Sequence, residues 1–129
     1  ELGAEGWVLF AGYCRGDRLP AAFRAMDALA YPAPGTDQSC RTVREALASG
    51  TPVLAARTGF LPELIDEGAT GFVLDLDEAA WTAAVERLCA RPDQLPALRA
   101  ACLATARRRF ALALQAERTL AFYRTLRPR

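Results

Sequence analysis

Four short apolar runs recur along the first part of the chain, each followed by a turn or a helical segment. They cover residues 7–12, 28–31, 53–56 and 71–74. Apolar runs of this kind that do not alternate with polar residues are typical of strands buried on both faces of a parallel sheet. We therefore predict four parallel strands joined by right-handed crossovers.

Helical segments are predicted between these strands, at residues 19–27, from about 40 to 49, and at 61–65. In the first of them Leu19, Phe23 and Met26 share one face. The regular alternation of strand and helix predicts an α/β fold, with a Rossmann-like parallel sheet and flanking helices.

After residue 75 the pattern becomes entirely helical. A helix is predicted at residues 77–90, following an Asp cap, and a Pro-containing break ends it. A second helix is predicted up to about Arg109, and a third from about Leu112. The chain thus divides into β/α units, residues 1–75, and an all-helical tail, residues 76–129.

The composition excludes several kinds of chemistry. The chain has 129 residues, 16 basic and 15 acidic, and no His. A net charge of +1 gives no reason to expect a nucleic-acid partner. Without His there is no Ser-His-Asp triad and no His-ligated metal site, and we expect no metal.

The cysteines and the lack of a long apolar run indicate the cellular compartment of the protein. Cys14, Cys40, Cys89 and Cys102 show no C-x-x-C spacing, so buried free thiols in a reducing cytosol are favoured over disulfides. No run reaches the roughly 18 apolar residues of a membrane span. We expect a cytoplasmic protein, with peripheral attachment to a membrane left open.

Residues 36–48 carry most of the candidate chemistry, because a Gly/Pro-rich turn there leads from a strand into a helix. The exposed N-terminus of such a helix favours anions through its free N–H groups and its dipole. Arg41, Thr42 and Val43 would supply the first-turn N–H groups. The Arg41 guanidinium could add a bidentate phosphate contact.

Two acids eight residues apart, Asp37 and Glu45, each have two interpretations. Glu45 could accept two hydrogen bonds from the vicinal diol of a ribose, or simply pair with Arg41 four residues earlier. Asp37 could accept from a sugar hydroxyl, or cap the helix in competition with Ser39.

Three further features are ambiguous from sequence. Tyr13 follows the first predicted strand and could flank a base, or be a half-buried loop aromatic. Cys40 stands at a helix start, where thiols are activated, but without His a catalytic Cys is not expected. The basic residues 107–109 lie at a helix end, where they could be a solvated terminus or face lipid.

Taken in order, these segments resemble the donor-binding domain of a GT-B fold retaining glycosyltransferase of family 4. The resemblance rests on Asp37-x7-Glu45 running into Ala-Leu-Ala-Ser-Gly-Thr-Pro-Val, which is similar to the family's acid-x7-Glu motif. Residues 7–12, 26–32, 59–65 and 68–74 are similar to further family motifs in the same order. Each motif is weak alone, but the ordered series is specific.

The resemblance implies a role for each candidate residue. Glu45 matches the residue that holds the donor ribose, and Asp37 the acid that contacts the transferred sugar, so both are the candidate catalytic residues. The diphosphate would bind the turn and helix start, at Ser39, Cys40, Arg41, Thr42 and Val43. Gln38 stands where the family commonly has Gly, which weakens the expected sugar contacts more than the nucleotide contacts.

The resemblance also implies what surrounds this segment. Nothing here matches the family's acceptor-binding N-terminal domain, or the two earlier strands whose basic residues neutralise the diphosphate. We therefore expect residues 1–129 to be part of a nucleotide-sugar-binding domain that is inactive alone. A nucleotide-diphosphate sugar would be the donor substrate, with no further cofactor. The sequence does not indicate the oligomeric state.

Two other functions remain as alternatives. In a non-catalytic α/β domain that binds a nucleotide, a phosphate or a partner, Asp37 and Glu45 would be only a cap and an ion-pair member. A GT-B-fold epimerase acting on a nucleotide sugar would be expected to use His, which this chain lacks.

Overall fold

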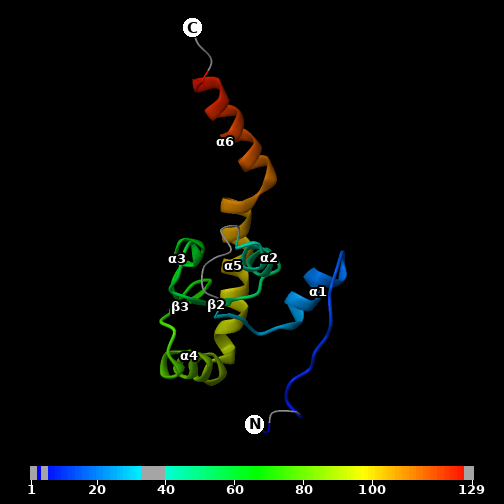
Figure 1. Cartoon of the computed structure of the whole chain (residues 1–129), viewed down its shortest axis with the longest axis vertical. Coiled ribbons are helices and arrows are strands. Elements are labelled where there is room, and N and C mark those ends of the chain that lie inside the picture. Colours follow the sequence, from blue (N-terminus) through cyan, green and yellow to red (C-terminus); the bar gives the residue numbers. More distant parts are fainter. Residues whose placement is uncertain (1–2, 4–5, 33–39, 127–129) are drawn as a thin grey trace.

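The computed structural model describes residue 3, residues 6–32 and residues 40–126, and shows a small parallel sheet between helices (Figure 1). Its strands are β1 (Leu29–Tyr31), β2 (Val53–Ala56) and β3 (Gly71–Leu74), in the order β1-β2-β3. Leu29 is in register with Val53, and Val53 with Gly71. The structure thus confirms three of the predicted strands and the predicted α/β class.

The fourth predicted strand is wrong for this structure. Residues 7–12 form no strand, and the side chains of Trp7 and Phe10 are each 92% exposed. In Figure 1 this segment runs as extended chain beside the first helix, away from the sheet. The physical reason is the lack of a partner, because no described strand pairs with it and a strand is stabilised by its neighbours.

The helices lie where the apolar periodicity predicts them. They are α1 (Arg18–Ala25), α2 (Arg41–Ala48), α3 (Leu61–Leu64), α4 (Glu78–Ala90), η1 (Pro92–Gln94), α5 (Leu95–Phe110) and α6 (Leu112–Thr125). The predicted cap of α4 is confirmed, since the Asp77 carboxylate accepts from the Ala80 N–H at 2.9 Å. None of the described helices is long and apolar enough to span a membrane.

The core lies on both faces of the sheet. On one face Val43 and Leu47 of α2 are fully buried with the inward side chains of β2. On the other face Leu54 and Phe72 pack with Ala84 of α4. Figure 1 shows α2 and α3 on one side of the strands and α4 on the other, with α5 running past them. β2 is therefore the buried centre of the fold.

Gly71 is required by the close approach of β2 and β3. A Cβ built at this position would lie 1.9 Å from the Val53 carbonyl oxygen, far inside van der Waals contact. At Gly68, three residues earlier, a Cβ would meet no atom within 4 Å. The second glycine of this motif therefore has a packing role in the sheet.

Two of the three arginines at the end of α5, Arg108 and Arg109, bind residues of the α/β part of the molecule. Asp66 accepts from Arg108 and from Arg109 at 3.3 Å each, and from the Thr105 hydroxyl at 2.9 Å. Arg109 also donates to the Glu63 carbonyl. These contacts anchor α5 to the loop after α3, while Arg107 and Arg108 stay exposed, as the interpretation as a solvated helix terminus expects.

The helical tail ends in a helix with little contact to the rest of the molecule. In Figure 1 α6 extends beyond the other elements, and none of its residues is buried. Leu112 is 80% exposed and Tyr123 61% exposed. In contrast, α5 packs along α2, and its buried Cys102 thiol donates to the Thr70 carbonyl at 3.5 Å. The four cysteines form no disulfide, but only Cys40 and Cys102 are buried as predicted, whereas Cys89 is exposed on α4.

Candidate functional site

The strand-turn-helix segment singled out from the sequence begins at the carboxyl end of β1. The strand ends at Tyr31 and the chain enters α2 at Arg41. Both α2 and α3 follow the carboxyl ends of parallel strands, so their first residues belong to the edge of the sheet where open α/β folds bind ligands. Asp37, Gln38 and Ser39 lie outside the described residues.

Cys40 starts α2 in a conformation that is uncommon for a residue with a side chain. Its φ and ψ are both 41°, in the left-handed region, and its side chain is 1% exposed within the core. Val43 is likewise fully buried. These two predicted donor-binding residues can therefore meet a ligand only through their main chain.

The first turn of α2 has free main-chain donors of the kind on which the predicted anion site depends. The N–H groups of Arg41, Thr42 and Val43 have no partner within the helix, because an α-helix bonds N–H groups only to carbonyls four residues earlier. The Arg41 side chain is 78% exposed beside them. This turn can hold an anion through N–H groups, helix dipole and guanidinium together.

Glu45 lies in the second turn of α2 and pairs with Arg41. Arg41 Nε is 3.7 Å from Glu45 Oε1, and the Glu45 side chain is 39% exposed. This is the ion pair that the simpler interpretation of Glu45 expects. The carboxylate is nevertheless accessible, and Glu45 also lies at the edge of a pocket. The geometry is thus compatible with both interpretations.

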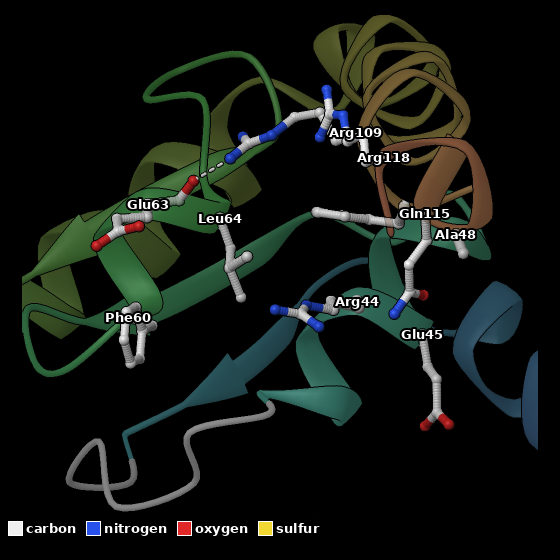
Figure 2. Close-up of a pocket in the computed structure, with 10 residues that line it drawn as sticks. Arg44, Glu45, Ala48, Phe60, Glu63, Leu64, Arg109, Gln115 and Arg118 are labelled. Atoms are coloured by element: carbon white, nitrogen blue, oxygen red, sulfur yellow. Dashed lines mark hydrogen bonds between the residues drawn. The ribbon is translucent and has the colours of Figure 1, made fainter. Parts of the chain in front are cut away.

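The pocket lies between α2, α3 and the junction of α5 with α6, and has a volume of about 690 Å³ (Figure 2). Its lining residues are mainly basic, acidic and aromatic: Arg44, Glu45, Ala48, Phe60, Glu63, Leu64, Arg109, Phe110, Gln115 and Arg118. Its volume falls in the range of small-molecule sites, roughly 300–1,000 Å³.

Tyr13 is not brought into this group. Its side chain is 78% exposed, its ring is covered by the Arg15 guanidinium at 4.8 Å, and it does not line the pocket. The structure therefore assembles Arg41, the first turn of α2 and Glu45, but not the predicted base-flanking aromatic.

Sequence reasoning missed most of the pocket. Arg44 directly precedes Glu45, and Phe60 lies in the motif at residues 59–65. These positions are the sequence signals that could have identified the two residues. Arg118 carried no such signal, because it comes from α6 and depends on the tertiary fold. No group of three or more acidic or Cys residues able to hold a metal occurs among the described residues.

Comparison with known proteins identifies relatives of this chain. The profile of the family described as "Glycosyl transferases group 1" matches residues 1–91. A D-inositol 3-phosphate glycosyltransferase of Corynebacterium kroppenstedtii is 39% identical over 95 residues, which cover 73% of this chain and 21% of that protein. A GDP-mannose-dependent alpha-mannosyltransferase of Mycolicibacterium smegmatis is 42% identical over 86 residues, 64% of this chain and 22% of that protein.

A solved structure shares the fold. HepE of Anabaena, crystallised in complex with UDP-glucose, superposes with a TM-score of 0.75 at 29% identity, over 93% of this chain and 34% of that one. The chain spans about a fifth of the length of the curated relatives it matches, at 21% and 22%.

Proposed function

This chain belongs to the family of group 1 glycosyl transferases, and we propose that it forms part of the nucleotide-sugar-binding domain of a retaining glycosyltransferase. The observation that carries the proposal is the position of Glu45. It lies with an accessible carboxylate one turn above the first N–H groups of α2, in a helix that starts at the carboxyl edge of the sheet. The family match over residues 1–91 includes this whole segment.

The N-terminus of α2 would bind the diphosphate of the donor. The N–H groups of Arg41, Thr42 and Val43 and the positive end of the helix dipole favour a negatively charged group. Cys40 contributes its main chain, since its side chain is buried in the core. Arg41, 78% exposed, can turn from Glu45 to a phosphate oxygen without leaving a buried charge.

Glu45 would hold the ribose of the nucleotide. A carboxylate has lone pairs for both hydroxyls of a vicinal diol, and such charge-assisted hydrogen bonds are the stronger kind. The pair with Arg41 at 3.7 Å is long for a hydrogen bond, so exchanging it for two diol contacts gains more than it loses.

The remaining predicted residues complete the donor site in this proposal. Asp37 would accept from a hydroxyl of the transferred sugar, with Gln38 and Ser39 following it along the same turn. Tyr13 would flank the base. Its ring is exposed, so this role needs a movement toward α2, or the base must reach out to it.

The proposed reaction is a group transfer at the anomeric carbon of the sugar. The bond from this carbon to the diphosphate oxygen breaks, and a bond to the acceptor hydroxyl oxygen forms on the same face. The hydroxyl proton leaves with the nucleoside diphosphate. The α2 N-terminus would stabilise the charge on that leaving group, which makes catalysis mainly positioning and electrostatics.

The donor nucleotide is a matter for experiment. HepE was crystallised with UDP-glucose, and the relative from Mycolicibacterium smegmatis is named as GDP-mannose-dependent. Both uridine and guanosine diphosphate sugars are therefore the donors to test.

One observation favours the alternative, a non-catalytic nucleotide- or phosphate-binding domain. The contact between Arg41 and Glu45 is the one expected if Glu45 is only an ion-pair member. In that case removing its charge would change the stability of the helix by about 0.3–0.5 kcal/mol and leave nucleotide binding unchanged.

Calorimetry on the full-length protein separates the two. We expect UDP or GDP to bind, and Glu45→Gln to weaken binding by about 1–3 kcal/mol, the loss of a charge-assisted partner. Glu86→Gln on the exposed side of α4 is the matched control and should bind as the wild type does. Asp37→Asn should lower turnover with the full donor while nucleoside diphosphate affinity is kept.

Two results would contradict the proposal. Equal nucleotide affinity in Glu45→Gln and Glu86→Gln would favour the non-catalytic alternative. A product with inverted anomeric configuration, determined by NMR, would reject the retaining mechanism while keeping the donor site.

A further inference from the structure

The interior of the pocket in Figure 2 is cationic, although both signs of charge line it. Arg44 points into the pocket toward Leu64, whereas the carboxylates of Glu45 and Glu63 point away from it. Glu45 is moreover engaged with Arg41 at 3.7 Å. The carboxylates therefore form the rim and leave the interior to the guanidinium groups.

Two of these guanidinium groups have no acidic partner in the part of the chain that the structure describes. Arg44 of α2 and Arg118 of α6 form no ion pair with any described residue. Arg109, by contrast, is bound to Asp66 and to the Glu63 carbonyl. A ligand anion would give Arg44 and Arg118 the partner that the fold gives Arg109.

Aromatic side chains from two elements line the same pocket. Phe60, at the start of α3, is 49% exposed, and Phe110, at the end of α5, lies under the Arg44 guanidinium at 5.7 Å. Leu64 forms an apolar floor. Such surfaces suit the apolar face of a ring-shaped ligand.

We propose that this pocket binds a small phosphomonoester carrying a ring, of the size of a sugar phosphate. Arg44 and Arg118 bind the phosphate, and Phe60 contacts the ring, since Phe110 already carries the Arg44 and Arg109 guanidinium groups. The volume of about 690 Å³ accommodates such a molecule. The site lies outside the first turn of α2, and it shares only Glu45, at its rim, with the proposed donor site.

One wall of the pocket is fixed before any ligand arrives. The contacts of Arg109 with Asp66 and Glu63 join the end of α5 to α3, and the Arg109 guanidinium lies over Phe110 at 5.6 Å. A preformed wall lowers the ordering cost of binding. Arg118, on the exposed α6, is the side chain that must be ordered.

The test is calorimetry on the full-length protein with glucose 6-phosphate, inorganic phosphate and glucose as probes. We expect glucose 6-phosphate to bind more tightly than phosphate, and glucose not to bind. Arg44→Gln and Arg118→Gln should each weaken binding about tenfold. Arg124→Gln, on α6 but outside the pocket, is the matched control.

Phe60→Ala distinguishes the ring contact from the phosphate contact. It should weaken glucose 6-phosphate to the affinity of inorganic phosphate and leave phosphate itself unchanged. Because the Phe60 side chain is 49% exposed, the variant should fold as the wild type does, and a thermal melt of each variant checks this.

Three outcomes would overturn the proposal. No binding of glucose 6-phosphate at millimolar concentration would do so, as would equal affinity in the Arg44, Arg118 and Arg124 variants. Displacement of glucose 6-phosphate by saturating UDP or GDP, with loss of binding in Glu45→Gln, would assign the probe to the donor site instead.

Discussion

Two apolar runs of this chain resemble each other in sequence and differ completely in their surroundings. β2 is at most 2% exposed and pairs with a strand on each side. Residues 7–12 contain equally apolar side chains, yet Leu9 is 88% exposed and no described strand pairs with them. An apolar run thus shows that a segment needs neighbours, but not where these neighbours come from.

The difference has a physical cause in the sheet. A strand gains its stability from hydrogen bonds and side-chain contacts with adjacent strands and helices, and very little from its own conformation. β2 receives all of these from β1, β3, α2 and α4. The matched segments cover only 21% and 22% of the relatives, so those proteins contain further chain that could supply strand partners for residues 7–12.

Gly71→Ala is expected to have the largest effect, because it disrupts the pairing that distinguishes β2. The new Cβ would lie 1.9 Å from the Val53 carbonyl oxygen, so the two strands must separate. We expect a loss of about 3–4 kcal/mol in the free energy of unfolding, measured by denaturant titration.

Gly68→Ala is the control for this substitution. It has a positive φ of 73° but open space around the site, so only about 1 kcal/mol should be lost. Equal losses in the two variants would mean that backbone conformation, not the contact of β2 with β3, decides the role of these glycines.

The sequence predicts well whatever depends on local pattern. The bounds of β2 and β3 are those predicted, and Asp77 caps α4 as expected. The left-handed start of α2 at Cys40 was not predicted, because an apolar thiol there reflects burial and not the usual capping chemistry.

Features that join distant parts of the chain were also not predictable. Asp66 meets Thr105, Arg108 and Arg109, about forty residues away, only because α5 passes the loop after α3. The pocket depends on the same approach of α5 and α6 to α2. For the candidate site, Glu45 and Arg41 could be paired from their spacing, whereas Tyr13 could not be placed without the position of residues 7–12.

Leu54→Ala and Leu9→Ala compare the two runs directly. Leu54 is 2% exposed against Phe72 and Ala84, so its truncation should cost about 2–4 kcal/mol. Leu9 is 88% exposed, and its truncation should change the stability of the 129-residue chain by less than about 0.5 kcal/mol.

The same pair in the full-length protein sharpens the comparison. There the apolar pattern of residues 7–12 predicts a buried strand, so Leu9→Ala should cost about 2 kcal/mol or more. If Leu9→Ala left the stability of the full-length protein unchanged, the strand prediction for residues 7–12 would be wrong for the full-length protein as well as for the 129-residue chain.

The smallest perturbation is chemical labelling of thiols, which changes no residue. The reactivity of Cys14 reports on the exposed run at residues 7–12, and that of Cys102 on the buried sheet. Cys102 lies fully buried near the sheet, and this burial raises the pKa of its thiol from 9.0 to about 12. Cys14, two residues after the exposed run, is half-buried. At pH 8 Ellman's reagent should therefore modify Cys14 and the exposed Cys89 in the native protein, and Cys102 only after unfolding.

The pH dependence follows from the sign of the shift. The unfolded thiol of Cys102 ionises near pH 9 and the folded one near 12, so its contribution to stability is complete below pH 9 and is lost as the pH rises toward 12. Cys102→Ala should remove this part of the pH dependence.

Rapid native labelling of Cys102 would contradict a closed core, and protection of Cys14 in the full-length protein alone would show that the exposed run is covered there.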